Sequence, residues 1–190
     1  MSVDGFIADP NDDTQQLFWW FFSGDTPMDV PFGDGSMTLM FARESAEVYE
    51  GVKASTGAIV SGRRMFDVAQ GWGGRHPLDV PVFIVTHEAP AEWAGTDSPF
   101  TFVTDGLESA ISQARQVAGD KNIAVGGADI TRQCLKAGLL DEIHIDLIPV
   151  LLGQGVRLFE HLGIEPVQLE RIMVKAAPQV THLRFRVVRP

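Results

Sequence analysis

The sequence predicts an α/β protein with a mostly parallel mixed sheet, helices on both faces of the sheet, and an antiparallel hairpin at the C-terminal end. Three observations support this fold class. Apolar strand-like runs alternate with helical patterns as far as residue 148, strand-like patterns alone follow, and glycine turns separate strands from helices. With 190 residues and no repeat or linker, we expect residues 1–190 to form a single domain.

Periodicity assigns the individual elements. Residues 2–8 are predicted to end a strand and enter a turn, and residues 9–36 to form a long loop around an aromatic run at 18–22. Leu39, Ala42, Ala46 and Tyr49 recur at helical spacing and predict a helix over 38–54. Short apolar runs predict four further strands, at 58–61, 82–86, 100–103 and 122–125.

The clearest predicted helix lies between Asp105 and Gly119. Asp105 and Glu108 have the spacing of a capping box, and Gly119 is a natural stop. A second helix is predicted over 128–137, after the turn at Gly126-Gly127. The last predicted strands are 142–148, 167–176 and 180–188.

Composition excludes several classes of protein. The chain has 45% hydrophobic and 21% charged residues, as ordinary globular proteins do. Its single cysteine, Cys134, excludes an internal disulfide and fits a reducing cytoplasm. No apolar run approaches the ~20 residues that span a bilayer, and Asp4 and Asp9 interrupt any signal peptide. We therefore expect a cytoplasmic protein without membrane or nucleic-acid partners, since its net charge is −10.

The charge is unevenly distributed. Residues 1–50 hold ten acidic residues and one basic residue, Arg43, whereas residues 171–190 hold five basic residues and no acidic one. A phosphorylated ligand must therefore bind through a few local groups, against the overall negative field.

Polar residues and glycines follow three of the predicted strands. They are Ser61-Gly62-Arg63-Arg64, Thr86-His87 and Gly126-Gly127-Ala128-Asp129. Ligands of open α/β sheets bind at the carboxyl ends of strands, where helix N-termini attract anions and arginine supplies several donors. Together the three junctions indicate a dinucleotide site, although each alone is also typical of a plain turn or a solvated helix start. Neither the Rossmann glycine pattern nor the Walker lysine motif is present.

A few other residues are candidates for chemistry. Asp4 is suited to bind a polar substrate or to relay a proton, with a simple Asp-Gly turn as the alternative. Trp72, between glycines, and the aromatic residues at 18–22 are suited to stack on a flat ring or to pack in the core. The histidines lack the spacing of a metal-binding helix, so no metal site is predicted, and Cys134 is expected in the core.

Taken in order, these residues resemble the dihydrofolate reductase-like family. The most similar branch is the riboflavin-biosynthesis reductase domain of bacterial bifunctional deaminase-reductases, with its stand-alone relatives. The resemblance covers nearly the whole chain and rests on residues 2–8, 62–66, 81–86, 126–127 and 138–159. The chain begins inside the family's first strand, so this strand is truncated or the true start lies upstream. Segment 10–36 is similar only to the stand-alone relatives, whose substrates are mostly unassigned.

The resemblance implies a three-layer α/β/α fold, NADPH as the cofactor and, frequently, a homodimer. The implied cofactor-binding residues are Ile7, Ala8, Ser61, Gly62, Arg63, Arg64, Met65, Thr86, His87, Gly126, Gly127, Ala128, Asp129 and Ile130. Among them, the arginines would hold phosphates, Thr86 and His87 would lie near the 2′-phosphate, and Ile7 and Ala8 would line the nicotinamide pocket. The implied substrate-binding residues are Asp4, Trp72, Leu152 and Gly153, and Asp4 is the candidate catalytic residue. On this resemblance the basic residues after 170 belong to terminal strands, as solvated or interface residues.

The predicted function is that of an NADPH-dependent reductase. It would transfer hydride to a C=N or C=O bond of a small heterocyclic or ribosylated substrate, as a 5-amino-6-(5-phosphoribosylamino)uracil reductase does. The alternatives are a dihydrofolate or pterin reductase, and a nucleotide-binding dimer module without turnover.

Overall fold

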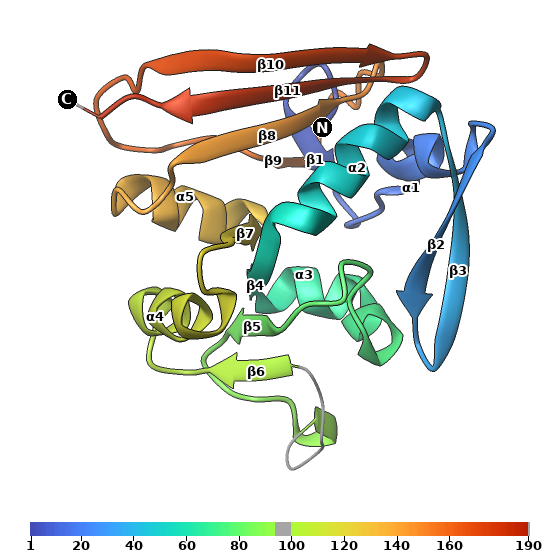
Figure 1. The fold of residues 1–190 in the computed structure, drawn as a ribbon. Coiled ribbons are helices and arrows are strands. Elements are labelled where there is room, and N and C mark those ends of the chain that lie inside the picture. The colour runs from blue at the N-terminus through green and yellow to red at the C-terminus, as the bar shows by residue number, and fades with distance from the viewer. Residues whose placement is uncertain (94–99, 190) are drawn as a thin grey trace. The chain divides into compact units, whose positions relative to one another are not determined.

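The computed structural model describes residues 1–93 and 100–189. The chain forms two compact units that are interleaved in the sequence. The first unit holds residues 1–28, 39–50 and 131–190, and the second unit holds residues 29–38 and 51–130. Figure 1 shows the elements along the chain.

A parallel four-stranded sheet forms the centre of the second unit. Its order is β6-β5-β4-β7. The strands are β4 (Thr56–Gly62), β5 (Val82–Val85), β6 (Phe100–Val103) and β7 (Asn122–Gly126). Each lies within two residues of its predicted bounds, because each contains a short apolar run. Strands β4 and β5 are mostly buried, whereas β6 and β7 each include an exposed residue.

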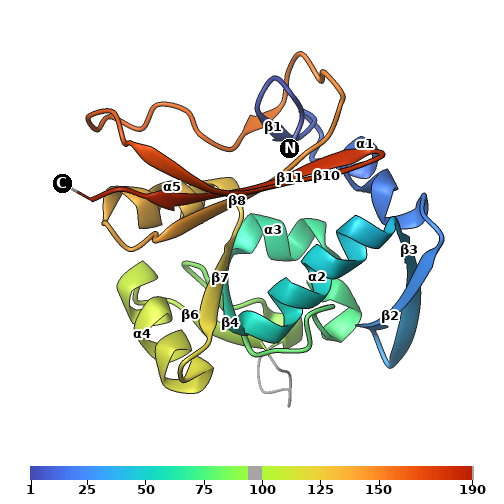
Figure 2. The ribbon, with the colours of Figure 1, turned by 45° about the horizontal axis from the view of Figure 1, so that its top comes forward.

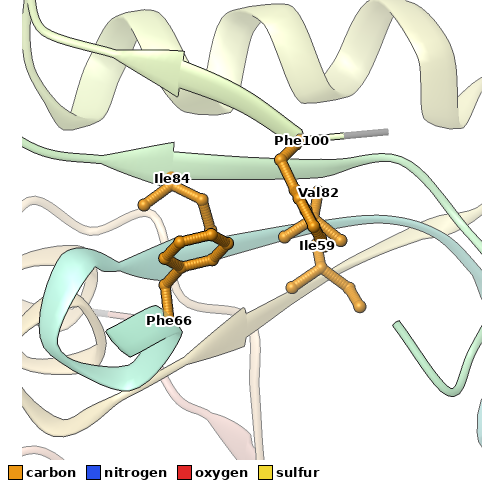
Figure 3. Close-up of a cluster of buried hydrophobic side chains, with 5 residues drawn as sticks. All are labelled: Ile59, Phe66, Val82, Ile84 and Phe100. Atoms are coloured by element: carbon orange, nitrogen blue, oxygen red, sulfur yellow. The ribbon is translucent and has the colours of Figure 1, made fainter. Parts of the chain in front are cut away.

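Helices pack against this sheet. Helix α3 (Arg63–Val68) places Phe66 against Ile59, Val82 and Ile84, and Figure 3 shows this cluster. Helix α4 (Leu107–Ala118) contacts β4, β5 and β7. Its buried stripe consists of Ala110, Ile111, Ala114 and Ala118, as the sequence predicts.

An antiparallel three-stranded sheet lies in the first unit, in the order β10-β11-β8. Its strands are β8 (Glu142–Leu147), β10 (Leu169–Ala177) and β11 (Val180–Val187), and Figure 2 shows them nearly edge-on. The predicted hairpin of β10 and β11 is confirmed, and β11 also pairs with β8. The fold is therefore α/β as predicted. Among the described residues, however, parallel and antiparallel strands are hydrogen-bonded in separate sheets.

Two short strands complete the first unit. Strand β1 (Phe6–Ala8) pairs antiparallel with β9 (Val156–Arg157). Residues 1–3 run beside the end of β8, where Ser2 bridges to Ile148 and the Val3 N–H donates to the Val150 carbonyl. Among the described residues, no helix is both long and apolar enough to cross a membrane.

The predicted helix over 38–54 is wrong at its start. Strand β3 (Gly35–Phe41) occupies that position and forms a hairpin with β2 (Thr26–Phe32), and helix α2 begins only at Arg43 and ends at Ser55. Leu39 and Phe41 are both buried, two residues apart, which is the period of a strand. The spacing of Leu39 and Ala42 also fits a helix, so the pattern alone does not separate the two structures.

The predicted loop over 9–36 contains further elements. Helix α1 (Gln15–Phe18) and the 3₁₀ helix η1 (Trp19–Phe22) precede β2. Within the aromatic run, Trp20 is buried beside Phe41, whereas Phe18, Trp19 and Phe22 remain exposed. The run therefore contributes one core residue and a partly exposed aromatic surface.

The start of α4 also differs from the prediction. Gly106, with φ of 105°, is the N-cap residue, and no side chain caps the helix. The Asp105–Glu108 capping box is therefore wrong, whereas Gly119 ends the helix as predicted, with φ of 59°. The remaining elements are α5 (Ala128–Lys136) and the 3₁₀ helices η2 (Gln70–Gly74) and η3 (Ala91–Trp93).

Candidate functional site

The three predicted strand-to-turn junctions lie at one edge of the parallel sheet. Strands β5, β4 and β7 are neighbours, with Gly62 opposite Val85 and Ser61 opposite Gly126. Their carboxyl ends therefore meet at the same edge. We call residues 61–65, 86–87 and 126–130 the junction edge.

Glycine is needed where the β4 and β7 junctions meet. A Cβ atom at Gly126 would lie 2.9 Å from the Met65 Sδ, and one at Gly62 would lie 3.1 Å from the Ile130 Cγ1. Gly127 has φ of 89°, which side chains rarely tolerate. These glycines let Met65 and Ile130 pack closely, so packing as well as ligand approach explains them.

The start of α3 offers backbone donors to an anion. Its N-cap residue, Gly62, is extended and has no side chain with which to accept from the first-turn N–H groups. The neighbouring Ser61 is fully buried. Uncapped N–H groups at a helix start attract negative charge.

Basic side chains lie at the same edge. The Arg63 guanidinium donates from Nε to the Asp67 carboxylate at 2.7 Å and from Nη1 to the Glu88 carbonyl at 3.2 Å. The Thr86 hydroxyl donates to the same carbonyl at 2.8 Å. Arg64 and His87 are exposed, and so is Asp129 at the start of α5, while Ala128 and Ile130 are buried. The junction edge thus combines backbone donors and cations with a single carboxylate of its own.

Asp4 is held by the first unit through several donors. Its carboxylate accepts from the Gly153 N–H at 2.7 Å and from the Leu152 N–H at 3.2 Å. A hydrogen bond from the Ser2 hydroxyl is the largest cause that lowers the pKa of Asp4, and the two backbone N–H groups lower it further. Three predicted substrate-binding residues, Asp4, Leu152 and Gly153, are therefore in direct contact, around an ionised carboxylate.

Ser2 donates to the Asp4 carboxylate, and no pattern in the sequence assigns it this role. Its side chain is fully buried, and its Oγ also accepts from the Phe6 N–H at 2.9 Å. The Ser-x-Asp-Gly turn is thus closed by its own serine.

Ile7 and Ala8 lie on β1, next to the glycine-rich segment that ends at β9. A Cβ at Gly155 would lie 2.1 Å from the Ala8 carbonyl oxygen, so this close approach requires glycine. Ala8 is buried and Ile7 is partly exposed. Of the two, Ile7 is the better placed to meet a ligand.

Trp72 packs with the aromatic cluster of the second unit. Its ring centroid lies 6.0 Å from those of Phe66 and Phe100 and 4.7 Å from that of His76. The backbone around it is left-handed, with φ of 58°, 49° and 67° at residues 71–73. The glycines beside Trp72 therefore turn its ring into the core rather than away from it, and its role toward a substrate stays a prediction.

In the first unit, no sequence pattern marks a series of three polar side chains in contact, of which two are buried and the third, Asp146, is exposed. The Ser45 Oγ lies 2.9 Å from the His182 Nε2, and the His182 Nδ1 lies 2.6 Å from an Asp146 carboxylate oxygen. Ser45 and His182 are each 1% exposed. Ser45 and His182 are 137 positions apart, so no sequence pattern indicates that they are in contact. Through these contacts, His182 of β11 connects Ser45 of α2 with Asp146 of β8.

A family model described as the RibD C-terminal domain matches residues 1–183. The uncharacterised protein YwjB of Bacillus subtilis (strain 168) is 25% identical over 134 residues, which cover 70% of this chain and 76% of that protein. Neither finding assigns a residue to a task.

Two solved structures show the same fold. A putative riboflavin biosynthesis protein from Shewanella sp. PV-4 aligns with a TM-score of 0.73 and 22% identity, over 100% of this chain and 96% of that chain. A diaminohydroxyphosphoribosylaminopyrimidine deaminase/5-amino-6-(5-phosphoribosylamino)uracil reductase from Thermotoga maritima aligns with a TM-score of 0.61 and 14% identity. That alignment covers 98% of this chain but 54% of the Thermotoga chain.

Proposed function

Because the chain belongs to the RibD C-terminal domain family, we propose that it is an NADPH-dependent reductase. Its substrate is a small heterocyclic or ribosylated compound, of the 5-amino-6-(5-phosphoribosylamino)uracil type. The Thermotoga maritima protein with the same fold is a 5-amino-6-(5-phosphoribosylamino)uracil reductase, which supports this reaction type.

The junction edge is the observation that carries the proposal. Adjacent parallel strands end there with an uncapped helix start at Gly62, a glycine turn at Gly126-Gly127 and the cations Arg63 and Arg64. Backbone donors and arginines are what a dinucleotide's phosphates require, so these residues fit the cofactor.

The chain's residues then have the following roles. Arg63, Arg64, Thr86 and His87 bind cofactor phosphates, including the 2′-phosphate, and residues 126–130 bind the pyrophosphate. Ile7 and Ala8 contact the nicotinamide. NADPH supplies, when bound, the hydride from its nicotinamide C4.

Asp4 binds and orients the substrate in this proposal. Since the pKa of Asp4 is lowered, its carboxylate is ionised at neutral pH and accepts hydrogen bonds. The Ser2 hydroxyl and the N–H groups of Gly153, Leu152 and Asp4 itself already donate to this carboxylate, which has about four lone pairs. A substrate N–H or O–H group therefore shares or replaces one of these hydrogen bonds, and a carboxylate held ionised by four donors favours positioning over proton transfer. Trp72, Leu152 and Gly153 complete the proposed substrate contacts.

The proposal includes a homodimer, which the family resemblance implies, in the cytoplasm, which the single cysteine fits. Sedimentation velocity on the purified protein measures the oligomeric state directly. A monomer at micromolar concentration would remove the dimer from the proposal without affecting the reductase activity.

Cofactor binding is tested by calorimetry with NADPH and NADH. We expect Arg63→Ala and Arg64→Ala each to weaken NADPH binding by about tenfold or more, and NADH binding less, because a lost charge-assisted hydrogen bond costs roughly 1.5–3 kcal/mol. The matched control is Arg115→Ala, an exposed arginine in the last turn of α4. The last turn of α4 lies beside the start of β4, at the opposite edge of the sheet.

Two results contradict the proposal. A wild-type protein that neither binds NADPH nor is stabilised by it is not this reductase. Equal losses of NADPH and NADH in both arginine variants exclude recognition of the 2′-phosphate. Turnover is then followed by the loss of NADPH absorbance with aminouracil and pterin substrates, and binding without turnover across this panel favours a nucleotide-binding module.

A further inference from the structure

Arg157, an exposed residue of β9, has two properties that together favour the binding of an anion. It is held in place by contacts on its side chain, and no described carboxylate forms an ion pair with it. The arginines that do pair with a carboxylate are Arg43, Arg63, Arg75, Arg132, Arg184, Arg186 and Arg189. In a chain with 25 acidic and 15 basic residues, a fixed arginine without such a partner is unexpected.

The side chain of Arg157 is fixed at both ends. Its guanidinium carbon lies 4.3 Å from the centroid of the Phe6 ring, a cation–π contact, and its Nη1 donates to the Asp4 carbonyl at 3.0 Å. Its backbone pairs with Phe6 in the β1–β9 ladder. Arg132 adds a hydrogen bond of 2.5 Å to the Arg157 carbonyl and is itself paired with Glu160.

These contacts leave most of the guanidinium's donors available. A guanidinium has five N–H groups, and the Asp4 carbonyl is the acceptor that the structure gives them. The residue is exposed, so the remaining donors face solvent. A pre-organised planar fork with available donors binds carboxylate or phosphate groups in a bidentate manner.

Asp4 supplies the complementary half. Its carboxylate is turned toward the Leu152 and Gly153 N–H groups and forms no ion pair with Arg157, although its carbonyl accepts from that residue. Asp4 and Arg157, which are in direct contact, therefore present an ionised carboxylate and a guanidinium that has no ion pair among the described residues. A ligand that carries both an anionic group and N–H or O–H donors matches this pair.

We propose that Arg157 binds an anionic group of the substrate, a phosphate or a carboxylate, while Asp4 binds the substrate's donors. This inference rests on the proposed function, because it takes Asp4 as a substrate-binding residue. It adds a specificity-determining residue that neither the sequence patterns nor the comparisons indicate.

Calorimetry on protein saturated with NADP⁺ tests the proposal, because the cofactor's phosphate sites are then filled. The probes are ribose 5-phosphate, ribonate and ribose, which carry a phosphate, a carboxylate and no anionic group. We expect one of the two anions to bind at least about tenfold more tightly than ribose. Arg157→Met, which keeps an apolar cover on Phe6, should remove this difference, and Arg157→Lys should restore part of it.

The matched control is Arg171→Met, which removes an exposed arginine of β10 that has no ion pair among the described residues. It should leave the binding of all three probes unchanged.

Equal binding of the three probes to the wild type, or equal losses in the Arg157 and Arg171 variants, overturns the proposal. NADP⁺ binding is measured in the same samples. A wild-type protein that does not bind NADP⁺ contradicts the proposed function. A wild-type protein that binds NADP⁺ but binds the three probes equally contradicts only the role of Arg157. If Arg157→Met does not fold, Arg157→Gln takes its place.

Discussion

At the scale of single residues, burial decides what the histidines of this chain do. His76 is mostly buried beside Trp72, and its Nδ1 accepts from the Leu78 N–H at 3.1 Å. Burial lowers the pKa of His76 to about 4. The imidazole is therefore neutral at physiological pH and acts as a hydrogen-bond acceptor in the core of the second unit.

This pKa predicts how stability depends on pH. The value in the folded protein lies below the ordinary value of 6.5, so the contribution of His76 is complete above pH 6.5 and is lost as the pH falls toward 4. The loss amounts to about 3 kcal/mol at most. Urea unfolding between pH 7 and pH 4 should show this loss in the wild type but not in His76→Asn, whose side-chain oxygen can still accept from the Leu78 N–H. The exposed His161, replaced by Asn, is the control. A parallel decline in all three proteins contradicts the assignment.

The residues of the candidate site were predictable where one segment carries them. Ser61 to Met65 and Gly126 to Ile130 follow strands that any apolar run would reveal, and parallel pairing then brings them to one edge. Ser2 and Arg157 were not predictable in this way. A buried serine and a guanidinium over a ring depend on the pairing of distant segments, since Ser2 bridges to Ile148 and Phe6 pairs with Arg157.

At the scale of elements, two glycines show how packing and helix propensity act in opposite directions. Gly57, in β4, lies against the end of α4, and a Cβ there would be 2.7 Å from the Ala118 carbonyl oxygen. Gly51 lies in α2, and a Cβ there would meet nothing within 4 Å. The first glycine is required by the close approach of helix and strand, and the second is not required.

The two alanine variants should therefore change stability in opposite directions. We expect Gly57→Ala to lower the free energy of unfolding by about 1–3 kcal/mol, because backbone atoms cannot move aside cheaply. We expect Gly51→Ala to raise it by about 0.5–1 kcal/mol, because alanine loses less entropy in a helix. Urea unfolding of both variants beside the wild type measures the two changes. A neutral Gly57→Ala variant means that α4 does not pack this closely on β4.

The elements that sequence patterns predicted correctly are those with a single period. Helix α4 carries an unbroken apolar stripe, and β10 and β11 follow one another along the chain. The segment at 35–42 combines both periods, and the pairing of β3 with β2 decides in favour of the strand. The two-residue strand β9 exists because β1 pairs with it, so no local pattern marks it.

At the scale of the whole molecule, ion pairs largely neutralise the basic C-terminal segment of the sequence. Four of the five basic residues after 170 pair with carboxylates of the first unit. The pairs are Lys175–Glu47, Arg184–Glu142, Arg186–Glu170 and Arg189–Asp141. These four basic residues are therefore engaged within their own unit.

The two units are joined through regular elements rather than linkers. The chain passes between them inside β2, β3, α2 and α5, at residues 28–29, 38–39, 50–51 and 130–131. Boundaries of independent domains normally fall in exposed, flexible segments. A helix or strand that crosses a boundary loses its own hydrogen bonds if one side unfolds alone. We therefore propose that residues 1–190 form a single cooperative domain, in agreement with the prediction from the sequence.

Cooperative unfolding can be measured in each unit at once, because the four tryptophans are divided between them. Trp19 and Trp20 belong to the first unit, and Trp72 and Trp93 to the second. In protein labelled with 5-fluorotryptophan, we expect all four ¹⁹F signals to lose their folded intensity at one urea concentration, and the calorimetric and van't Hoff enthalpies to agree. The buried Trp20 and the half-buried Trp72 are the most informative, since each packs in the core of its own unit. Gly57→Ala serves as the internal control: although it acts in the second unit, it should shift the midpoints of both pairs by the same amount. A shift confined to Trp72 and Trp93 would show that the units unfold separately.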